Sequence, residues 1–209
     1  MSDLYQNKYR ISSARLQSWD YASEGLYFVT ICTQNRERYF GEVINGEMQP
    51  SEIGQVVNEE WFKTPGLRPD MNVELGEFVV MPNHIHGIVI IGANEYNSDG
   101  GVVALGIDAD INARIDGRDA IRVDGRDAMH RVSTTTAKNQ FGPQRKNLAS
   151  IIRGYKSVVT TYARKNQIDF AWQPRFHEHI IRSEDDYDRI STYIAHNPEN
   201  WNQDKFFKV

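Results

Sequence analysis

Two histidines separated by one apolar residue, His84 and His86, are the residues of this chain whose types and spacing are best suited to chemistry. They begin an apolar run that continues to residue 91 and predicts a β-strand. In a strand, residues i and i+2 point to the same face, so the two imidazoles should lie side by side while Ile85 faces the other way. Such a pair offers two nitrogen ligands to a divalent metal ion. The pattern alone is also compatible with two structural histidines.

A tyrosine and an asparagine near the end of the chain could complete a site of this kind. Tyr193 and Asn197 are four residues apart in a predicted helix and should therefore share a face. A tyrosine can attack a phosphodiester and keep the bond energy in a covalent phosphotyrosine. Because its unperturbed pKa is about 10, a metal ion or a base must assist. The amide oxygen of Asn197 would be a third ligand in a site suited to Mg²⁺ or Mn²⁺; a tyrosine packed in the core is the alternative for Tyr193.

Hydrophobic periodicity predicts the elements that position these residues. The predicted strands cover residues 26–33, 73–80, 84–91 and a short stretch near 180, and the predicted helices cover 51–62, a segment starting at 147, and 183 to about 197. This order fits an α+β fold, a ferredoxin-like or RRM-like antiparallel sheet with helices packed on it, plus a C-terminal helix that carries the tyrosine.

Length and composition predict one domain over all 209 residues. Residues 92–144 are rich in Gly, Asp and Arg, contain a short tandem repeat and lack amphipathic periodicity, so we expect a flexible insertion there. A hydrophobic fraction of 40% and a charged fraction of 25% are typical of a soluble protein. With no apolar run of about 18 residues, no signal-peptide pattern and a single cysteine, we expect a cytoplasmic protein, monomeric or homodimeric, without a membrane partner.

The charge is distributed unevenly, although the net charge is only −4. Residues 145–182 carry eight basic and two acidic side chains, whereas residues 41–80 carry two basic and eight acidic ones. A local basic surface is what binds nucleic-acid phosphates, although a solvated helix face would have the same composition. The residues we select for DNA binding are Arg153, Lys156 and Arg175 as phosphate contacts and Trp172 as a platform for an unpaired base.

Four segments give the chain a resemblance to a known family. It is similar to the single-tyrosine HUH transposases, and most closely to the branch called REP-associated tyrosine transposases. The segments are residues 27–30 with Asn35 and Arg36, residues 81–86, residues 172–182 and residues 193–201.

The resemblance implies a metal-dependent enzyme that nicks single-stranded or hairpin DNA and transfers the strand through a tyrosine linked to the 5′ phosphate. By this resemblance, His84 and His86 correspond to the family's histidine pair and Tyr193 corresponds to its nucleophile. Asn197 corresponds to the polar residue that can complete the metal site. Tyr155 departs from the pattern and could compete as nucleophile. Two other functions stay open: a hairpin-binding protein without catalysis, and a metal-dependent phosphoesterase that uses water.

Overall fold

The computed structural model describes residues 19–97 and 145–207, and most of the predicted insertion, residues 98–144, lies outside this part of the chain. Within the described residues, no helix is both long and apolar enough to cross a bilayer. The elements in chain order are β1 (Gly25–Cys32), η2 (Gln34–Arg36), β2 (Gly41–Ile44), β3 (Glu47–Pro50), α1 (Glu52–Lys63), η3 (Pro69–Met71), β4 (Val73–Met81), β5 (His84–Ile91), α3 (Leu148–Lys165), β6 (His177–Ile181), α4 (Glu184–Ala195) and η4 (Trp201–Gln203).

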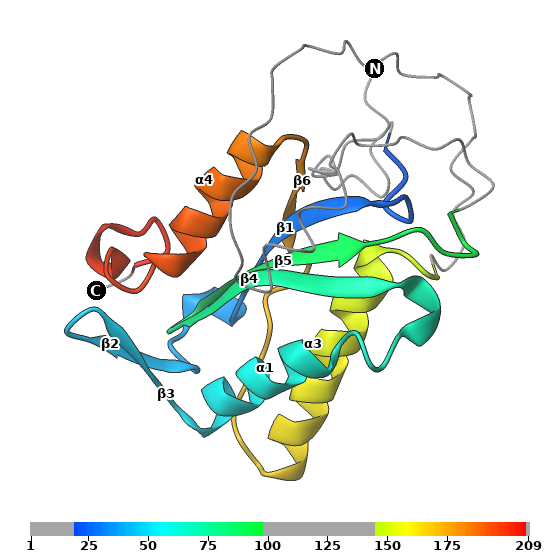
Figure 1. Ribbon diagram of the computed structural model, residues 1–209. Coiled ribbons are helices and arrows are strands. Elements are labelled where there is room, and N and C mark those ends of the chain that lie inside the picture. The colour runs from blue at the N-terminus through cyan, green and yellow to red at the C-terminus, as the bar shows by residue number, and fades with distance from the viewer. Residues whose placement is uncertain (1–18, 98–144, 208–209) are drawn as a thin grey trace, which may run out of the picture.

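A four-stranded antiparallel sheet in the order β4-β5-β1-β6 forms the centre of the fold (Figure 1). The strands β1, β4, β5 and β6 with the helices α1 and α3 follow the βαββαβ pattern, and each helix crosses over a strand to connect two parallel ones. This is the ferredoxin-like arrangement expected from the sequence, and the predicted α+β fold is confirmed.

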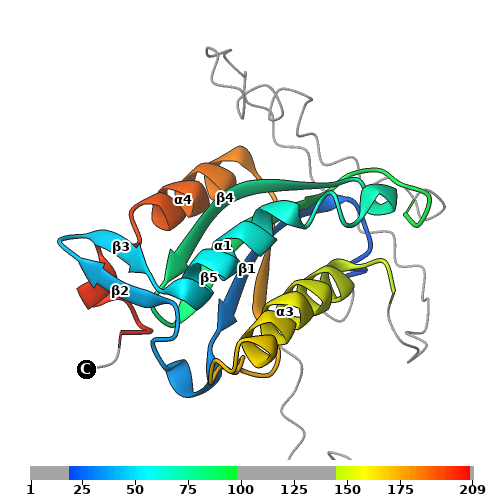
Figure 2. The ribbon, with the colours of Figure 1, turned by 90° about the horizontal axis from the view of Figure 1, so that it is seen from below.

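The two faces of the sheet are covered by different helices. Helices α1 and α3 lie side by side on one face (Figure 2), where Trp61 and Tyr155 pack against strand residues such as Val29 and Ile85. Helix α4 lies on the opposite face, and Ile194 packs there against strand residues of a smaller cluster. Because side chains alternate along a strand, neighbouring residues of β1 and β5 enter two separate cores.

A β-hairpin that we did not predict, β2–β3, extends from one end of the sheet (Figure 1). Its two-residue turn is Asn45-Gly46, both with positive φ (54° and 81°), as the right-handed twist of a tight hairpin requires. Val43 of this hairpin packs against the cluster of Met81, Trp201 and Phe206. The hairpin therefore helps to hold the C-terminal segment beside the end of the sheet.

Tyr155, the tyrosine that could compete as nucleophile, belongs to the core. It is 4% exposed and its hydroxyl donates to the backbone oxygen of Val57 at 2.8 Å. Burial raises its pKa well above the usual value. Tyr155 lies on the α1–α3 face of the sheet, away from the histidine pair.

Gly87 allows β5 to pack closely against Trp61 of α1. Replacing it should therefore lower the stability of the fold. A Cβ at this position would lie 2.5 Å from Cζ2 of Trp61 and 3.0 Å from Cδ2 of Phe78. We expect Gly87→Ala to lower the free energy of unfolding by about 1–3 kcal/mol through overpacking, measured by urea denaturation. Gly66→Ala is the control, since its Cβ would meet nothing closer than 3.7 Å. Equal losses in both variants would contradict the packing argument.

Candidate active site

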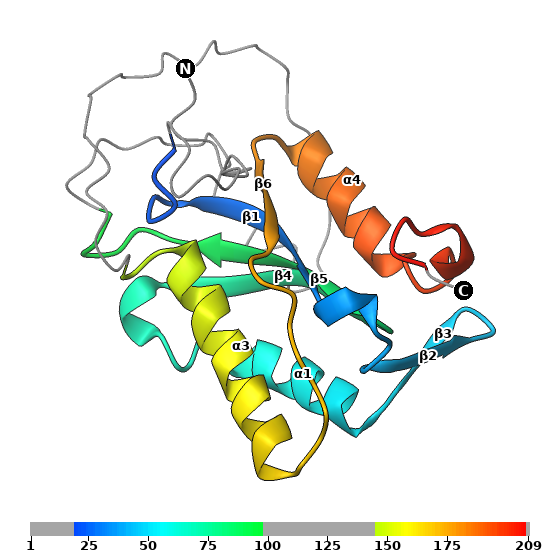
Figure 3. The ribbon, with the colours of Figure 1, turned by 180° about the vertical axis from the view of Figure 1, so that it is seen from behind.

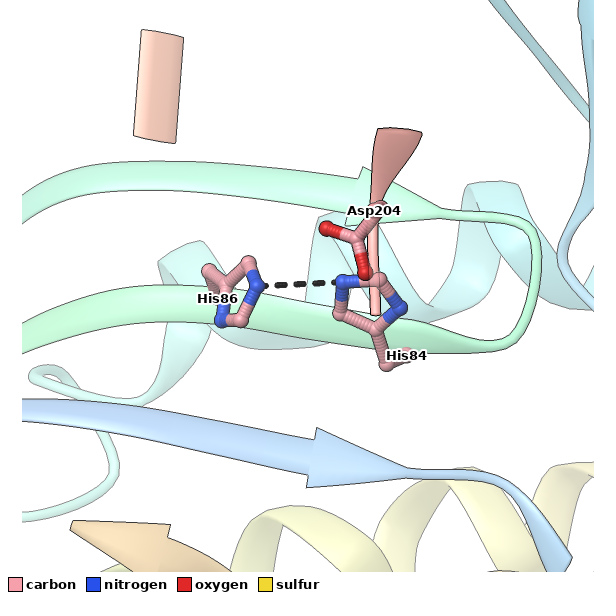
Figure 4. A group of neighbouring side chains, drawn as sticks. All are labelled: His84, His86 and Asp204. Carbon is pink, nitrogen blue, oxygen red and sulfur yellow. Dashed lines mark hydrogen bonds between the residues drawn. The ribbon is translucent and has the colours of Figure 1, made fainter. Parts of the chain in front are cut away.

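Strand β5 places His84 and His86 on the sheet face that α4 covers. In the register, Cys32 lies opposite His84 and Thr30 lies opposite His86 on β1. Both histidines are buried, at 0% and 1% exposure, and Ile85 between them faces the α1–α3 core. The alternation inferred from the sequence is confirmed, and the two rings lie side by side at the end of the sheet (Figure 4).

The buried side chain of Asn83 fixes the tautomer of His84. Its Nδ2 donates to the backbone oxygens of Arg36 at 3.2 Å and of Phe206 at 2.8 Å. Since carbonyl oxygens only accept, this orientation leaves the Asn83 Oδ1 facing Nδ1 of His84 at 2.9 Å. Nδ1 must therefore carry the hydrogen, and Nε2 keeps the lone pair that a metal ligand needs.

The ring of His86 is held by Thr30, whose Oγ1 lies 2.8 Å from Nδ1. Nε2 of His86 points toward Nε2 of His84 at 3.1 Å (Figure 4). Two nitrogen ligands about 2.1 Å from a common ion and at right angles to each other are about 3.0 Å apart. The spacing of the two nitrogens thus suits a shared metal ion.

Burial keeps both imidazoles neutral. It lowers the pKa of His84 well below the usual value, with further lowering by His86, Lys205 and Arg36. It lowers the pKa of His86 to about 3, and the positive charge of Lys205 adds to this effect. A cation at this position would therefore not have to displace protons from either ring at neutral pH.

Asp204, which we did not predict, brings a carboxylate to the pair. It follows η4, and its ligand oxygen and the histidine nitrogens all lie within 4.8 Å of one another (Figure 4). Oδ1 of Asp204 accepts from the backbone nitrogen of Phe206 at 2.6 Å, which fixes the side chain. Two imidazoles and a carboxylate form a donor set that fits a divalent ion.

Tyr193 projects from α4 toward this cluster. Its hydroxyl lies 3.1 Å from Nε2 of His86 and donates to Oδ2 of Asp204 at 3.5 Å. The side chain is 41% exposed, so the hydroxyl lies between the buried cluster and solvent. Burial raises its pKa, and the charge of Asp204 raises it further, so a nearby cation is needed to produce the phenolate.

Asn197 lies just after the end of α4, in the turn that follows Ala195, rather than within the helix as expected. It is 3% exposed, and its Nδ2 donates to Oδ2 of Asp204 at 3.4 Å. Its Oδ1 is buried and has no hydrogen-bond partner among the described residues. An unsatisfied buried acceptor beside Asp204 is suited to a cation, and the role of Asn197 as a ligand stays a prediction.

The four residues selected for DNA binding lie on α3 and on the loop between α3 and β6 (Figure 3). Arg153 and Arg175 are exposed. Lys156 donates to the backbone oxygens of Gln173 (2.7 Å) and Arg175 (3.1 Å), and burial lowers its pKa to about 8. Trp172 donates from Nε1 to the Lys156 oxygen at 3.2 Å and packs in the core's aromatic cluster. The backbone nitrogen of Gln173 donates to the oxygen of Cys32, the residue opposite His84, so this loop lies at the same end of the sheet as the histidines. DNA contact by the four residues stays a prediction.

No protein-family model matches the chain. A solved structure of a REP-associated tyrosine transposase bound to a REP hairpin is 18% identical with a TM-score of 0.49, and the match covers 95% of this chain and 76% of that one. A candidate transposase from Deinococcus radiodurans R1 is 13% identical with a TM-score of 0.34, over 87% of this chain and 95% of that one. Both of these proteins are described as transposases.

A protein of Haemophilus influenzae, described as uncharacterized, is similar over nearly the whole length of both chains. The two sequences are 35% identical over 196 residues, which cover 93% of this chain and 92% of that protein. This chain therefore belongs to the same family as the Haemophilus influenzae protein.

Proposed function

We propose that this protein is a metal-dependent endonuclease and strand transferase of the HUH tyrosine type, a transposase that acts on single-stranded or hairpin DNA. The observation that supports this best is the position of the Tyr193 hydroxyl, 3.1 Å from Nε2 of His86 and beside a His-His-Asp cluster. A half-exposed phenol at the mouth of a buried ligand set can meet a phosphate of DNA without rearrangement of the sheet.

In the proposed reaction the Tyr193 oxygen attacks the phosphorus of one phosphodiester. A P–O bond to tyrosine forms, the bond from phosphorus to the 3′ oxygen breaks, and the DNA ends as a 5′-phosphotyrosine and a free 3′ hydroxyl. The phenol loses one proton, which can pass to solvent through the hydrogen bond to Oδ2 of Asp204, and the departing 3′ oxygen takes one proton from solvent. Attack by a 3′ hydroxyl on the phosphotyrosine would reverse these steps and rejoin the strands.

The ligands that we propose for the metal ion are Nε2 of His84 and His86 together with Asp204, and Oδ1 of Asn197 as predicted from the sequence. When bound, the ion supplies positive charge that polarises the phosphate and favours the phenolate. Mg²⁺ takes oxygen ligands almost entirely, so two imidazoles favour Mn²⁺ of the two predicted ions.

Replacing the proposed nucleophile tests the reaction itself. We expect wild-type protein, incubated with Mn²⁺ and end-labelled hairpin DNA that has single-stranded flanks, to give a protein–DNA adduct on a denaturing gel. Tyr193→Phe should abolish the adduct because the attacking oxygen is removed. Tyr187→Phe, on the same helix, is the matched control and should retain it, since this residue packs in the small core under α4.

Other products would point to the other functions. Cleavage without an adduct that persists in Tyr193→Phe would indicate a phosphoesterase that uses water. Binding of the hairpin with neither cleavage nor adduct would indicate a DNA-binding protein without catalysis. Either result contradicts the proposed tyrosine chemistry.

The metal ligands can be tested without DNA. We expect His86→Ala and Asp204→Asn to weaken Mn²⁺ binding by about 100-fold and about 10-fold, measured by isothermal titration calorimetry, because the first loses a donor nitrogen and the second loses the negative charge of the carboxylate. His179→Ala is the control: this histidine is already bound to Asp186 at 2.7 Å. Unchanged affinity in both ligand variants would show that the ion, if bound, lies elsewhere.

The buried histidines also predict how metal affinity depends on pH. Two histidines with ordinary pKa values near 6.5 would lose about 100-fold in affinity between pH 7.5 and 5.5, as protons compete for both nitrogens. With the pKa of His86 lowered to about 3 and that of His84 lowered as well, we expect little loss over this range. A steep fall below pH 6.5 in a Mn²⁺ titration would show that the rings are accessible to protons.

A further inference from the structure

A row of side chains crosses the sheet from His86 on β5 to His177 on β6, and His177 has no role in the chemistry proposed above. Strand β1 lies between these two strands, and its Thr30 pairs with His86 on one side and with His177 on the other. Directly opposite residues of an antiparallel pair carry their side chains on the same face. Because Oγ1 of Thr30 lies 2.8 Å from Nδ1 of His86, all three side chains belong to the face that α4 covers.

His177 is the member of this row that a substrate can reach. Thr30 and His86 are buried, at 4% and 1% exposure, whereas His177 is exposed. Its ring makes no hydrogen bond to another described residue. His179, two residues further on the same face of β6, is exposed as well, but its Nε2 is bound to Asp186 of α4 at 2.7 Å. Of these two histidines, His177 is therefore the one whose ring nitrogens can both meet a substrate.

The spacing of the row suits a displacement at phosphorus in which the attacking and departing oxygens are in line. The Tyr193 hydroxyl lies 3.1 Å from Nε2 of His86, so the attack would begin at the β5 end of the row. The departing oxygen leaves on the opposite side of phosphorus. Strands β5 and β6 are two strand spacings apart, about 9–10 Å, which leaves room for one phosphodiester and a hydrogen bond of about 2.6–3.2 Å. A departing oxygen on the β6 side would thus face His177.

We propose that His177 is the general acid that protonates the departing 3′ oxygen. The protonated imidazole gives up one N–H proton as the bond from phosphorus to the 3′ oxygen breaks, so a 3′ hydroxyl leaves and a neutral imidazole remains. In rejoining, the neutral imidazole takes a proton from the attacking 3′ hydroxyl. This proposal rests on the proposed function, since it assigns to His177 the proton that solvent would otherwise supply to the bond that Tyr193 attacks.

The test replaces the departing oxygen by sulfur, which leaves as a thiolate and needs no proton. The bond that wild-type protein cleaves in the labelled hairpin with Mn²⁺ is mapped first, and hairpins are then made with oxygen or sulfur as the 3′ bridging atom there. We expect His177→Gln, which keeps an N–H donor but cannot transfer its proton, to slow adduct formation on the oxygen substrate by about 100-fold. On the sulfur substrate it should react at nearly the wild-type rate.

His179→Gln is the matched control, because His179 lies on the same face of β6 but opposite Phe28 rather than Thr30. It should react like the wild type on both substrates. An equal loss of rate on both substrates in His177→Gln would indicate a role in binding, and this result, no loss on the oxygen substrate, or the same rescue by sulfur in the control would overturn the proposal while the tyrosine chemistry stands. No adduct from wild-type protein on either substrate would overturn both.

Discussion

The candidate site depends on the buried side chain of Asn83. Its amide nitrogen binds two backbone oxygens from distant parts of the chain, Arg36 after β1 and Phe206 near the C-terminus, and its oxygen then receives the hydrogen of His84. The planar amide of Asn83 thus fixes the tautomer of His84 and joins three segments of the chain. Because the bonds to Phe206 and His84 are buried and the bond to Arg36 is partly buried, leaving a partner unpaired would cost free energy, and this favours the assembled state.

The same arrangement would allow the proposed metal ligands, although buried, to serve the proposed reaction at the surface. The histidines lie in the sheet, where the register and burial set their positions, whereas Tyr193 and Asp204 come from α4 and from the segment after η4 that close over the end of the sheet. The sheet holds the ring nitrogens of the two histidines in place, and the side chain of Tyr193 remains 41% exposed. Fixed ligands beside an accessible nucleophile fit chemistry on a large, extended substrate.

Most of the fold could be predicted because the signals are local. Alternation placed His84 and His86 on one face, and helical periodicity located α1, α3 and α4 to within a few residues. The hairpin β2–β3 was missed although Asn45-Gly46 signals a tight turn. Asp204 could not be predicted, because it lies in an irregular segment where no periodicity relates a residue to the sheet. Its position follows from tertiary contacts such as those of Phe206 with Met81.

Two residues on either side of the predicted insertion contact the same short segment: Asn97 donates to the oxygen of Ala22, and Leu148 donates to that of Tyr21. Strand β5 separates this place from the proposed metal ligands, since it begins at His84 and ends at Ile91, a length of about 23 Å. The two ends of the segment between Asn97 and α3 therefore lie close together, at the opposite end of β5 from the proposed metal ligands. Because the entropy cost of closing a loop rises only slowly with its length, a connection between two such neighbouring points can vary in length at little cost in stability.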